Sequence, residues 1–143
     1  MANATNNMNQ LANGKGGIQI NIPVKGATRI YDGIMIAQLT STGMAVPGST
    51  ASSGACVGVA THEVNNTSGA DGDARLVVEV EALFRFANAS ANPFSVATPI
   101  GSPAYMSDDH TVNSTDVGAT LKKCGYFYGM EPDGLVRVFV TPR

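Results

Sequence analysis

The fold is decided by residues 75–86, which read Arg-Leu-Val-Val-Glu-Val-Glu-Ala-Leu-Phe-Arg-Phe. From Val78 to Phe86 every second residue is apolar, and the positions between them hold Glu79, Glu81, Leu83 and Arg85. Because successive side chains of a strand point to opposite faces, this alternation predicts one long strand with a buried face and a more polar face. Such a strand would span about 40 Å. It shows no catalytic pattern, so we interpret it as a scaffold.

Short strand-like segments separated by turn residues fill the rest of the chain. Asp32-Gly33, Thr42-Gly43 and Pro132-Asp133-Gly134 are turn signals between apolar runs. No segment has a convincing helical period, although residues 116–123 could form a turn or two. The pattern predicts an all-β protein, a single small barrel or sandwich of short antiparallel strands. The expected strands are 18–24, 34–39, 44–46, 55–64, 75–86, 103–107, 111–112, 124–129 and 135–141.

The two halves of the chain show a weak internal repeat. Gly33 and Gly101 lie 68 residues apart, and so do Cys56 and Cys124. The order of strands and turns around each pair is similar. We therefore expect two similar halves that together close one barrel.

The composition favours a structural protein. Charged residues make up 14% of the chain, well below the usual quarter, so its polar surface consists mainly of uncharged residues. A surface with so few charges is typical of a protein that is part of a larger assembly. The net charge of -2 and the lack of a Lys or Arg cluster argue against nucleic-acid binding. No apolar run is long enough to span a membrane, and the N-terminus lacks the pattern of a secretory signal.

The chain divides into an extended arm, residues 1–24, and a β-barrel domain, residues 25–143. Residues 1–17 have almost no apolar periodicity and would be disordered alone in water. In residues 18–24, Ile18, Ile20 and Ile22 alternate with polar residues, and Pro23 places this strand at a sheet edge or against a partner.

Candidate metal or redox chemistry is sparse. Cys56 and Cys124 lie in apolar runs without ligand spacing, so we expect buried free thiols, although a disulfide stays possible if their strands are neighbours. Titratable residues crowd only at His62-Glu63 and Asp108-Asp109-His110. A metal would need further ligands at either place, so we expect no metal and no cofactor.

Candidate catalytic groups are equally sparse, and we expect no enzyme. Glu79 and Glu81 share a face of the long strand with Arg75 and Arg85, which indicates a solvated or partner-facing charged stripe. The glycine run at residues 14–17 is not a phosphate loop, because no Gly stands at position 9 and Gly16 follows Lys15. No nucleophile elbow is present.

Five stretches together resemble the small β-barrel capsid decoration (cement) proteins of tailed bacteriophages. The sequence differs from that pattern at Ala82-Leu83, where relatives often carry a Gly, and the Asn-rich arm lies outside the resemblance. The stretches are Thr-Arg-Ile-Tyr-Asp-Gly-Ile-Met-Ile (28–36), Gly-Val-Ala-Thr (58–61), Val-Glu-Val-Glu-Ala-Leu-Phe-Arg-Phe (78–86), Ile-Gly-Ser-Pro-Ala-Tyr-Met-Ser-Asp (100–108) and Val-Arg-Val-Phe-Val (136–140).

The resemblance implies a virion protein on the outer surface of the capsid, made in the host cytoplasm. It implies that the major capsid protein is the partner and that the chain forms a homotrimer, less often a dimer, which bridges capsid subunits. An arm that adds a strand to a neighbour provides main-chain hydrogen bonds. We expect Leu11, Ile18, Ile20 and Ile22 to anchor it.

Two other classes of function stay open. A tail or fibre-base module of the virion would have the same β composition. A carbohydrate-binding or hydrolytic β domain would need a pocket where polar side chains converge, and no sequence motif indicates one. The location of the chain in particles separates the first alternative from decoration, and a glycan or substrate screen tests the second.

Overall fold

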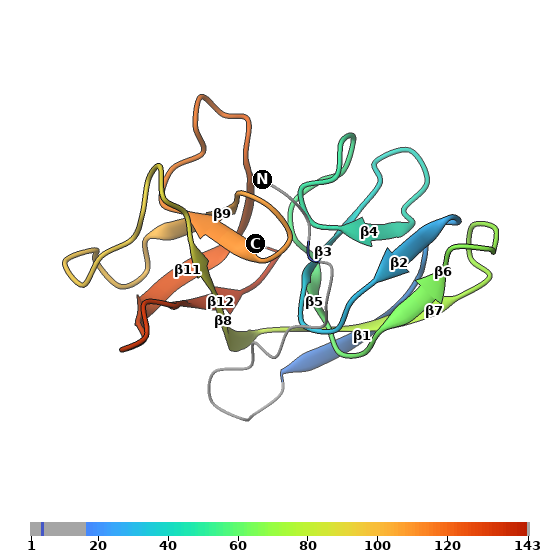
Figure 1. Ribbon diagram of the computed structural model, residues 1–143, viewed down its shortest axis with the longest axis horizontal. Coiled ribbons are helices and arrows are strands. Elements are labelled where there is room, and N and C mark those ends of the chain that lie inside the picture. Colours follow the sequence, from blue (N-terminus) through green and yellow to red (C-terminus); the bar gives the residue numbers. More distant parts are fainter. Residues whose placement is uncertain (1–3, 5–16, 143) are drawn as a thin grey trace.

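The computed structural model describes Ala4 and residues 17–142. Within these residues the protein consists of strands joined by turns and loops, with no helix and hence no membrane-spanning one (Figure 1). The prediction of an all-β barrel protein is confirmed. The strands are β1 (Ile18–Pro23), β2 (Thr28–Ile30), β3 (Met35–Gln38), β4 (Ala45–Pro47), β5 (Gly58–Ala60), β6 (Val64–Asn66), β7 (Arg75–Val80), β8 (Ala82–Asn88), β9 (Pro103–Met106), β10 (Thr111–Asn113), β11 (Lys122–Met130) and β12 (Val136–Val140).

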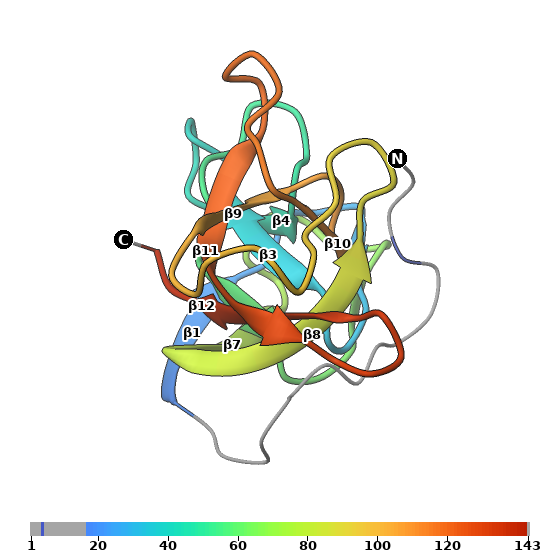
Figure 2. The same cartoon turned by 90° about the vertical axis from the view of Figure 1, so that its left-hand side faces the viewer.

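The strands form two lobes that lie side by side (Figure 1). In the first lobe, five strands form a sheet in the order β1-β7-β5-β3-β4, and β2 pairs with β6 beside it. In the second lobe, five strands form a closed barrel in the order β10-β8-β12-β11-β9. Figure 2 views this second barrel from its outer end.

Both lobes have the same topology. Read around the closed barrel from β8, the order is β8-β12-β11-β9-β10, which matches β1-β7-β5-β3-β4 strand for strand. The pairings between these neighbours are antiparallel in both lobes. The barrel closes through the parallel pair β10–β8, and at the matching place in the first lobe a single parallel bridge joins Val24 to Ala45.

The 68-residue spacing seen in the sequence is structural. Residues 35–38 of β3, shifted by 68, are residues 103–106 of β9. Gly33 and Gly101 both have positive φ, 84° and 94°. Their N–H groups donate to equivalent strands, to Ala60 O at 2.9 Å and to Phe127 O at 2.8 Å. Two similar halves are therefore confirmed, but the expectation that together they close one barrel is wrong, since the closed barrel consists of strands of the second half alone.

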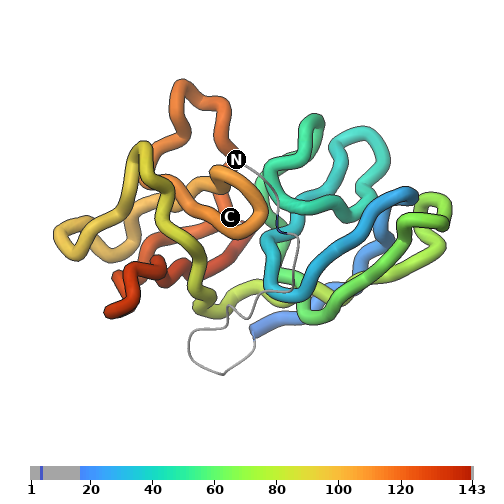
Figure 3. The backbone as a smooth tube through the Cα atoms, viewed as in Figure 1, coloured from blue at the N-terminus to red at the C-terminus, as the bar shows by residue number. Residues whose placement is uncertain are grey.

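The predicted long strand is broken at its middle. Glu81 has φ of 59°, in the left-handed region, and divides the segment into β7 and β8. The alternation continues through the break, so Val78 faces the core of the first lobe while Phe84 and Phe86 face that of the second. Figure 3 shows the chain crossing between the lobes at this point. Alternation of apolar and polar residues shows which side chains share a face, but it does not show a bend in the backbone such as the one at Glu81. The sequence therefore predicted a single strand.

Each lobe has its own hydrophobic core, and β3 lies between the two. Ile34 and Ile36 belong to the first core, whereas Met35 belongs to the second. A strand covered on both faces needs apolar residues at consecutive positions, which explains the uninterrupted run Ile-Met-Ile-Ala at residues 34–37. The expected strand 55–64 is shorter, because only residues 58–60 pair as β5 and β6 begins at Val64.

Backbone hydrogen bonds and close packing join the lobes. Met35 N–H donates to Asp109 O at 2.8 Å, and Cys56 N–H donates to Lys123 O at 3.1 Å. A Cβ atom at Gly48 would lie 2.7 Å from Sδ of Met106 across the junction. The lobes are therefore packed into one body.

Candidate functional site

β1 is the part of the expected arm that the structure describes as a strand, and it lies at the edge of the first sheet. β1 pairs with β7 from Ile18↔Val80 to Pro23↔Arg75, and Val24 N–H donates to Ala74 O at 2.9 Å in the same register. Along an antiparallel ladder, hydrogen-bonded residue pairs alternate with pairs that are not hydrogen-bonded. Val24 belongs to a hydrogen-bonded pair, so every second residue before it also forms backbone hydrogen bonds to β7. The N–H and C=O groups of Gln19 and Asn21 therefore point away from β7.

No described strand covers this outward edge over residues 18–22. β4 lies on this outward side and contacts the segment after β1 only at the Val24–Ala45 bridge. There, Lys25 N–H donates to Ala45 O at 3.1 Å. The equivalent strand β8 is paired on both sides, with β12 and β10. β10 pairs with β8 only at Ala87 and Asn88, so in both lobes this side of the strand is paired near its C-terminal end alone.

The isoleucines of β1 differ in exposure along the strand. Ile22 is 8% exposed and packs in the first core, whereas Ile20 is 39% exposed and Ile18 is 59% exposed. β1 carries no charged residue, although charges are a common protection of strand edges. Leu11, the fourth residue expected to anchor the arm, lies outside the described residues. The expectation that these residues contact a neighbour stays a prediction.

The charged stripe expected on the long strand is wrong at Glu79. Glu79 is 8% exposed, and its Oε2 accepts a hydrogen bond from Gly17 N–H at 3.0 Å, directly before β1. Arg75 is exposed, and its Nε donates to Asn21 Oδ1 at 2.6 Å on β1. Both side chains therefore hold β1 onto β7 and do not form a solvated row.

Asp109 binds the N-terminal residue that the structure describes. Ala4 N–H donates to Asp109 Oδ1 at 2.8 Å, and Ala4 also packs against the first core. Asp109 is 1% exposed, and burial raises the pKa of its carboxyl, while hydrogen bonds from His110 and Ala4 oppose the rise. This carboxylate lies at the junction of the lobes, since its backbone oxygen accepts from Met35.

The acidic turn Asp108-Asp109-His110 brings three possible metal ligands within 4.8 Å of one another. Two contacts within the turn use some of these ligand atoms, whereas Asp109 Oδ2 is buried without a hydrogen-bond partner. Asp108 Oδ1 accepts from His110 N–H at 2.9 Å, and His110 Nδ1 lies 2.8 Å from Asp109 Oδ1. His62 and Glu63 do not join this group; Val77 N–H donates to His62 Nε2 at 3.1 Å, and Glu63 pairs with Arg29. The absence of a metal stays a prediction.

The cysteines are free and buried, which confirms the thiol expectation. Burial raises the pKa of Cys56 to about 12 and that of Cys124 well above its ordinary value. The Sγ of Cys56 lies 3.3 Å from Gly58 O, and that of Cys124 lies 3.4 Å from Ala104 O. Thiols this reluctant to ionise are poor nucleophiles and metal ligands, so they serve as core side chains.

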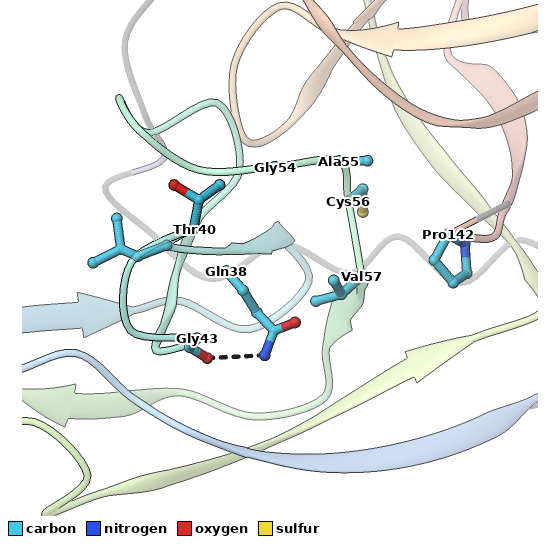
Figure 4. A pocket seen from close by; sticks show the side chains of 9 residues that line it. Gln38, Thr40, Gly43, Gly54, Ala55, Cys56, Val57 and Pro142 are labelled. Atoms are coloured by element: carbon cyan, nitrogen blue, oxygen red, sulfur yellow. Dashed lines mark hydrogen bonds between the residues drawn. The ribbon is translucent and has the colours of Figure 1, made fainter.

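Two depressions in the described part of the surface show no catalytic pairing. One of about 360 Å³ lies beside the β3–β4 turn, where Gln38 Nε2 donates to Gly43 O at 2.8 Å (Figure 4). Its one titratable side chain is the buried Cys56. Another of about 360 Å³ lies between the lobes, lined by the hydroxyl-rich loop 49–53 and by residues 106–107 and 120–122, with Lys122 as its single charged residue. Neither pocket holds an acid–base pair.

Comparison with known proteins gives this chain no family. No family model matches it, and no curated protein or solved structure matches either.

Proposed function

We propose that this protein is a structural component of a phage virion that decorates the outside of the head, where it binds the major capsid protein and bridges neighbouring subunits. The observation that carries the proposal is the open edge of β1, which is uncharged and flanked by the exposed side chains of Ile18 and Ile20. Soluble proteins often protect such an edge with charged side chains, and their absence from residues 18–22 favours a partner strand.

The edge supports binding by strand addition. The outward N–H and C=O groups of Gln19 and Asn21 supply main-chain hydrogen bonds to an extended segment of the capsid protein. Ile18 and Ile20 supply apolar contact beside them. Each contact is weak alone, but the symmetry of a shell repeats it many times, and avidity then gives stable attachment without a deep pocket.

A binding role also fits the pattern of charges and pockets. Neither of the two depressions described above pairs an acid with a base. The proposal therefore assigns no reaction to this chain. It includes a homotrimer, since an arrangement of identical copies lets each subunit bridge neighbouring capsid proteins.

The copy number of the chain in particles tests the proposal. Purified particles of the phage that encodes it are analysed by quantitative mass spectrometry, with the major capsid protein as the reference. We expect a ratio of order one, as symmetry-repeated decoration requires. A handful of copies per particle would assign the chain to the tail or fibre base, and absence from particles would contradict a virion role.

The binding mode is tested on heads that lack this chain. Deleting residues 1–17 is expected to weaken binding to the heads while both lobes stay folded. Gln19→Pro is the sharper test, because it removes an outward N–H and leaves the bonds to β7 in place. Ile20→Pro is the matched control for folding, since it removes a bond to β7 and is expected to lower the melting temperature. Unchanged head binding by both the deletion and Q19P would contradict strand addition.

A further inference from the structure

The outer face of the second barrel carries two arginines among aromatic and aliphatic side chains. The face belongs to three paired strands, β8, β12 and β11, which are labelled in Figure 2. Phe84, Phe127 and Val138 of these strands lie in the core. Because side chains alternate between the two faces of a strand, the residues on either side of them point outward. We call this outward set the arginine face: Leu83, Arg85, Tyr126, Tyr128, Arg137 and Phe139.

Aromatic rings make up part of the arginine face and stay accessible. Tyr128 is 43% exposed, and its ring centroid lies 5.9 Å from that of Phe139 on the paired strand. The Nζ of Lys123 lies 3.9 Å from the ring centroid of Tyr126. Aromatic residues and arginine are enriched where proteins bind one another. The composition of the arginine face is therefore typical of an interaction surface.

The two arginines lie directly opposite each other. Arg85 of β8 pairs in register with Arg137 of β12. Like charges at directly opposite positions destabilise a sheet. An anion bound at this pair would neutralise the repulsion, so the pairing favours an anionic ligand.

The guanidinium of Arg137 is incompletely bonded within the described residues. Its Nε is buried without a hydrogen-bond partner and lies 3.6 Å from Glu131 Oε1. The Arg137 side chain as a whole is 39% exposed, so an external carboxylate can reach its guanidinium. Arg29 of the first lobe is the contrasting case, because its Nε and Nη2 both donate to Glu63 Oε2. Arg137 therefore keeps donors for a further carboxylate.

An exposed aliphatic side chain borders Arg137. A Cβ atom at Gly129 would lie 3.6 Å from Nη2 of Arg137 and 3.8 Å from Cδ1 of Ile100. Ile100 belongs to the loop between β8 and β9, where it is 61% exposed and Val96 is 91% exposed. A cation beside apolar groups has less water around it, which strengthens its attraction to an anion.

The charges indicate carboxylates of a protein and not a nucleic acid. The arginine face has two cations, Lys123 lies beside it, and Glu131 pairs with Arg137. The chain as a whole carries a net charge of -2, whereas binding to a phosphate backbone depends on many cations. The planar fork of a guanidinium matches a carboxylate with two parallel hydrogen bonds.

We propose that the arginine face binds an acidic segment of a partner protein. Carboxylates of that segment pair with Arg85 and Arg137, and an apolar residue beside them contacts Tyr128 and Phe139. The rings exclude water around the ion pairs, which strengthens them. The inference rests on this face and not on the edge of β1 or on decoration of heads, so either proposal can fail alone.

The test is an NMR titration of the isotope-labelled full chain with a capped hexaglutamate peptide. We expect shifts of the backbone amides in β8, β11 and β12, and binding about 10-fold weaker for Arg85→Gln and for Arg137→Gln. Arg137→Lys should also bind more weakly than wild type, because an ammonium cannot form the two parallel bonds. Lys25→Gln is the matched control, since it removes one cation from the first lobe, and we expect it to bind like wild type.

Three outcomes would contradict the inference. If R85Q and R137Q bind hexaglutamate like wild type, or if the shifts lie mainly in the first lobe, the arginine face is not the site. If capped hexaglutamine shifts the same amides equally, the charge of the ligand plays no part. If hexathymidylate binds this face more tightly than hexaglutamate, the ligand is a phosphate chain and the acidic protein segment is wrong. The amide spectrum of each free variant separates weaker binding from loss of the fold.

Discussion

Glu81 N–H donates to Val140 O at 2.8 Å, and its Oε1 accepts from the hydroxyl of Thr141 at 2.9 Å. These bonds hold a residue with φ of 59° at the point where β7 of the first lobe becomes β8 of the second. The left-handed conformation costs a non-glycine residue about 1–2 kcal/mol, so the contacts to the end of β12 offset a local strain. The bend at Glu81 is what allows two lobes to form.

Substitution of Glu81 should reveal this strain. Glu81→Val places a β-branched residue at positive φ and removes the bond to Thr141, whereas Glu81→Gly removes the same bond without the steric conflict. We expect E81V to be less stable than E81G by about 1–2 kcal/mol, measured by urea denaturation. At Leu83, inside β8, the order should reverse, because Gly weakens a strand. Equal stability of E81V and E81G would contradict the left-handed geometry.

Gly125 should not tolerate a side chain. A Cβ atom there would lie 2.0 Å from Phe139 O, a backbone atom of the paired strand β12, so one strand would have to move. We expect Gly125→Ala to lower the free energy of unfolding by at least about 2 kcal/mol, as overpacking does. Gly54→Ala is the control, because nothing lies within 4 Å of its Cβ position. Similar stability of the two variants would mean that β11 and β12 are farther apart in solution.

The two thiols should be unreactive in the folded protein. With the pKa of Cys56 at about 12, its thiolate fraction at pH 8 is on the order of 1 in 10,000. We expect almost no reaction with a thiol reagent under native conditions and two thiols per chain after denaturation. The pKa of Cys56 in the folded protein lies above the ordinary 9.0. The stability that the buried, protonated thiol contributes is therefore complete below pH 9 and is lost as the pH rises toward 12. Rapid native labelling would contradict the burial.

Asp109 should make stability depend on pH in the opposite sense to most carboxylates. Burial raises its pKa above the ordinary 3.8, so the folded chain holds this proton more tightly than the unfolded chain. Its contribution is most favourable below that value and is lost as pH rises through the folded pKa. Relative to Asp109→Asn, the wild type should therefore become less stable between acidic and neutral pH.

Urea denaturation over that pH range checks the prediction for Asp109. His110 contacts the Asp109 carboxylate, and Asp108 lies in the same turn, so the comparison is repeated with His110→Gln in both proteins. This control removes the imidazole from both proteins, so that the difference between them reports on the Asp109 carboxyl. A wild type that instead loses stability relative to D109N on acidification would show that hydrogen bonds outweigh burial at this carboxyl.

Local patterns predicted most of the strands but not how they assemble. The hairpin at residues 34–46, the turn at Asp108-Asp109 and the closing strand follow from alternation and turn residues, and the structure has them. The short pair β2–β6 was not predicted, because three residues are too few to show a period. The exposure of Val96 and Ile100 was missed as well. The sequence signal for this exposure is that two aliphatic residues lie in a segment without charged residues that contains prolines.

The sequence by itself determined the β class, the buried thiols and the doubled plan. The first two follow from local patterns, namely alternation along the strands and apolar residues around each cysteine. The third follows from the 68-residue spacing between matching positions of the two halves. Only the tertiary structure decided that the doubled plan gives two lobes, that Glu79 is buried, and that no described strand covers the edge of β1 over residues 18–22. These features depend on a positive φ at Glu81 and on contacts between residues far apart in the chain. Local periodicity carries no information about either.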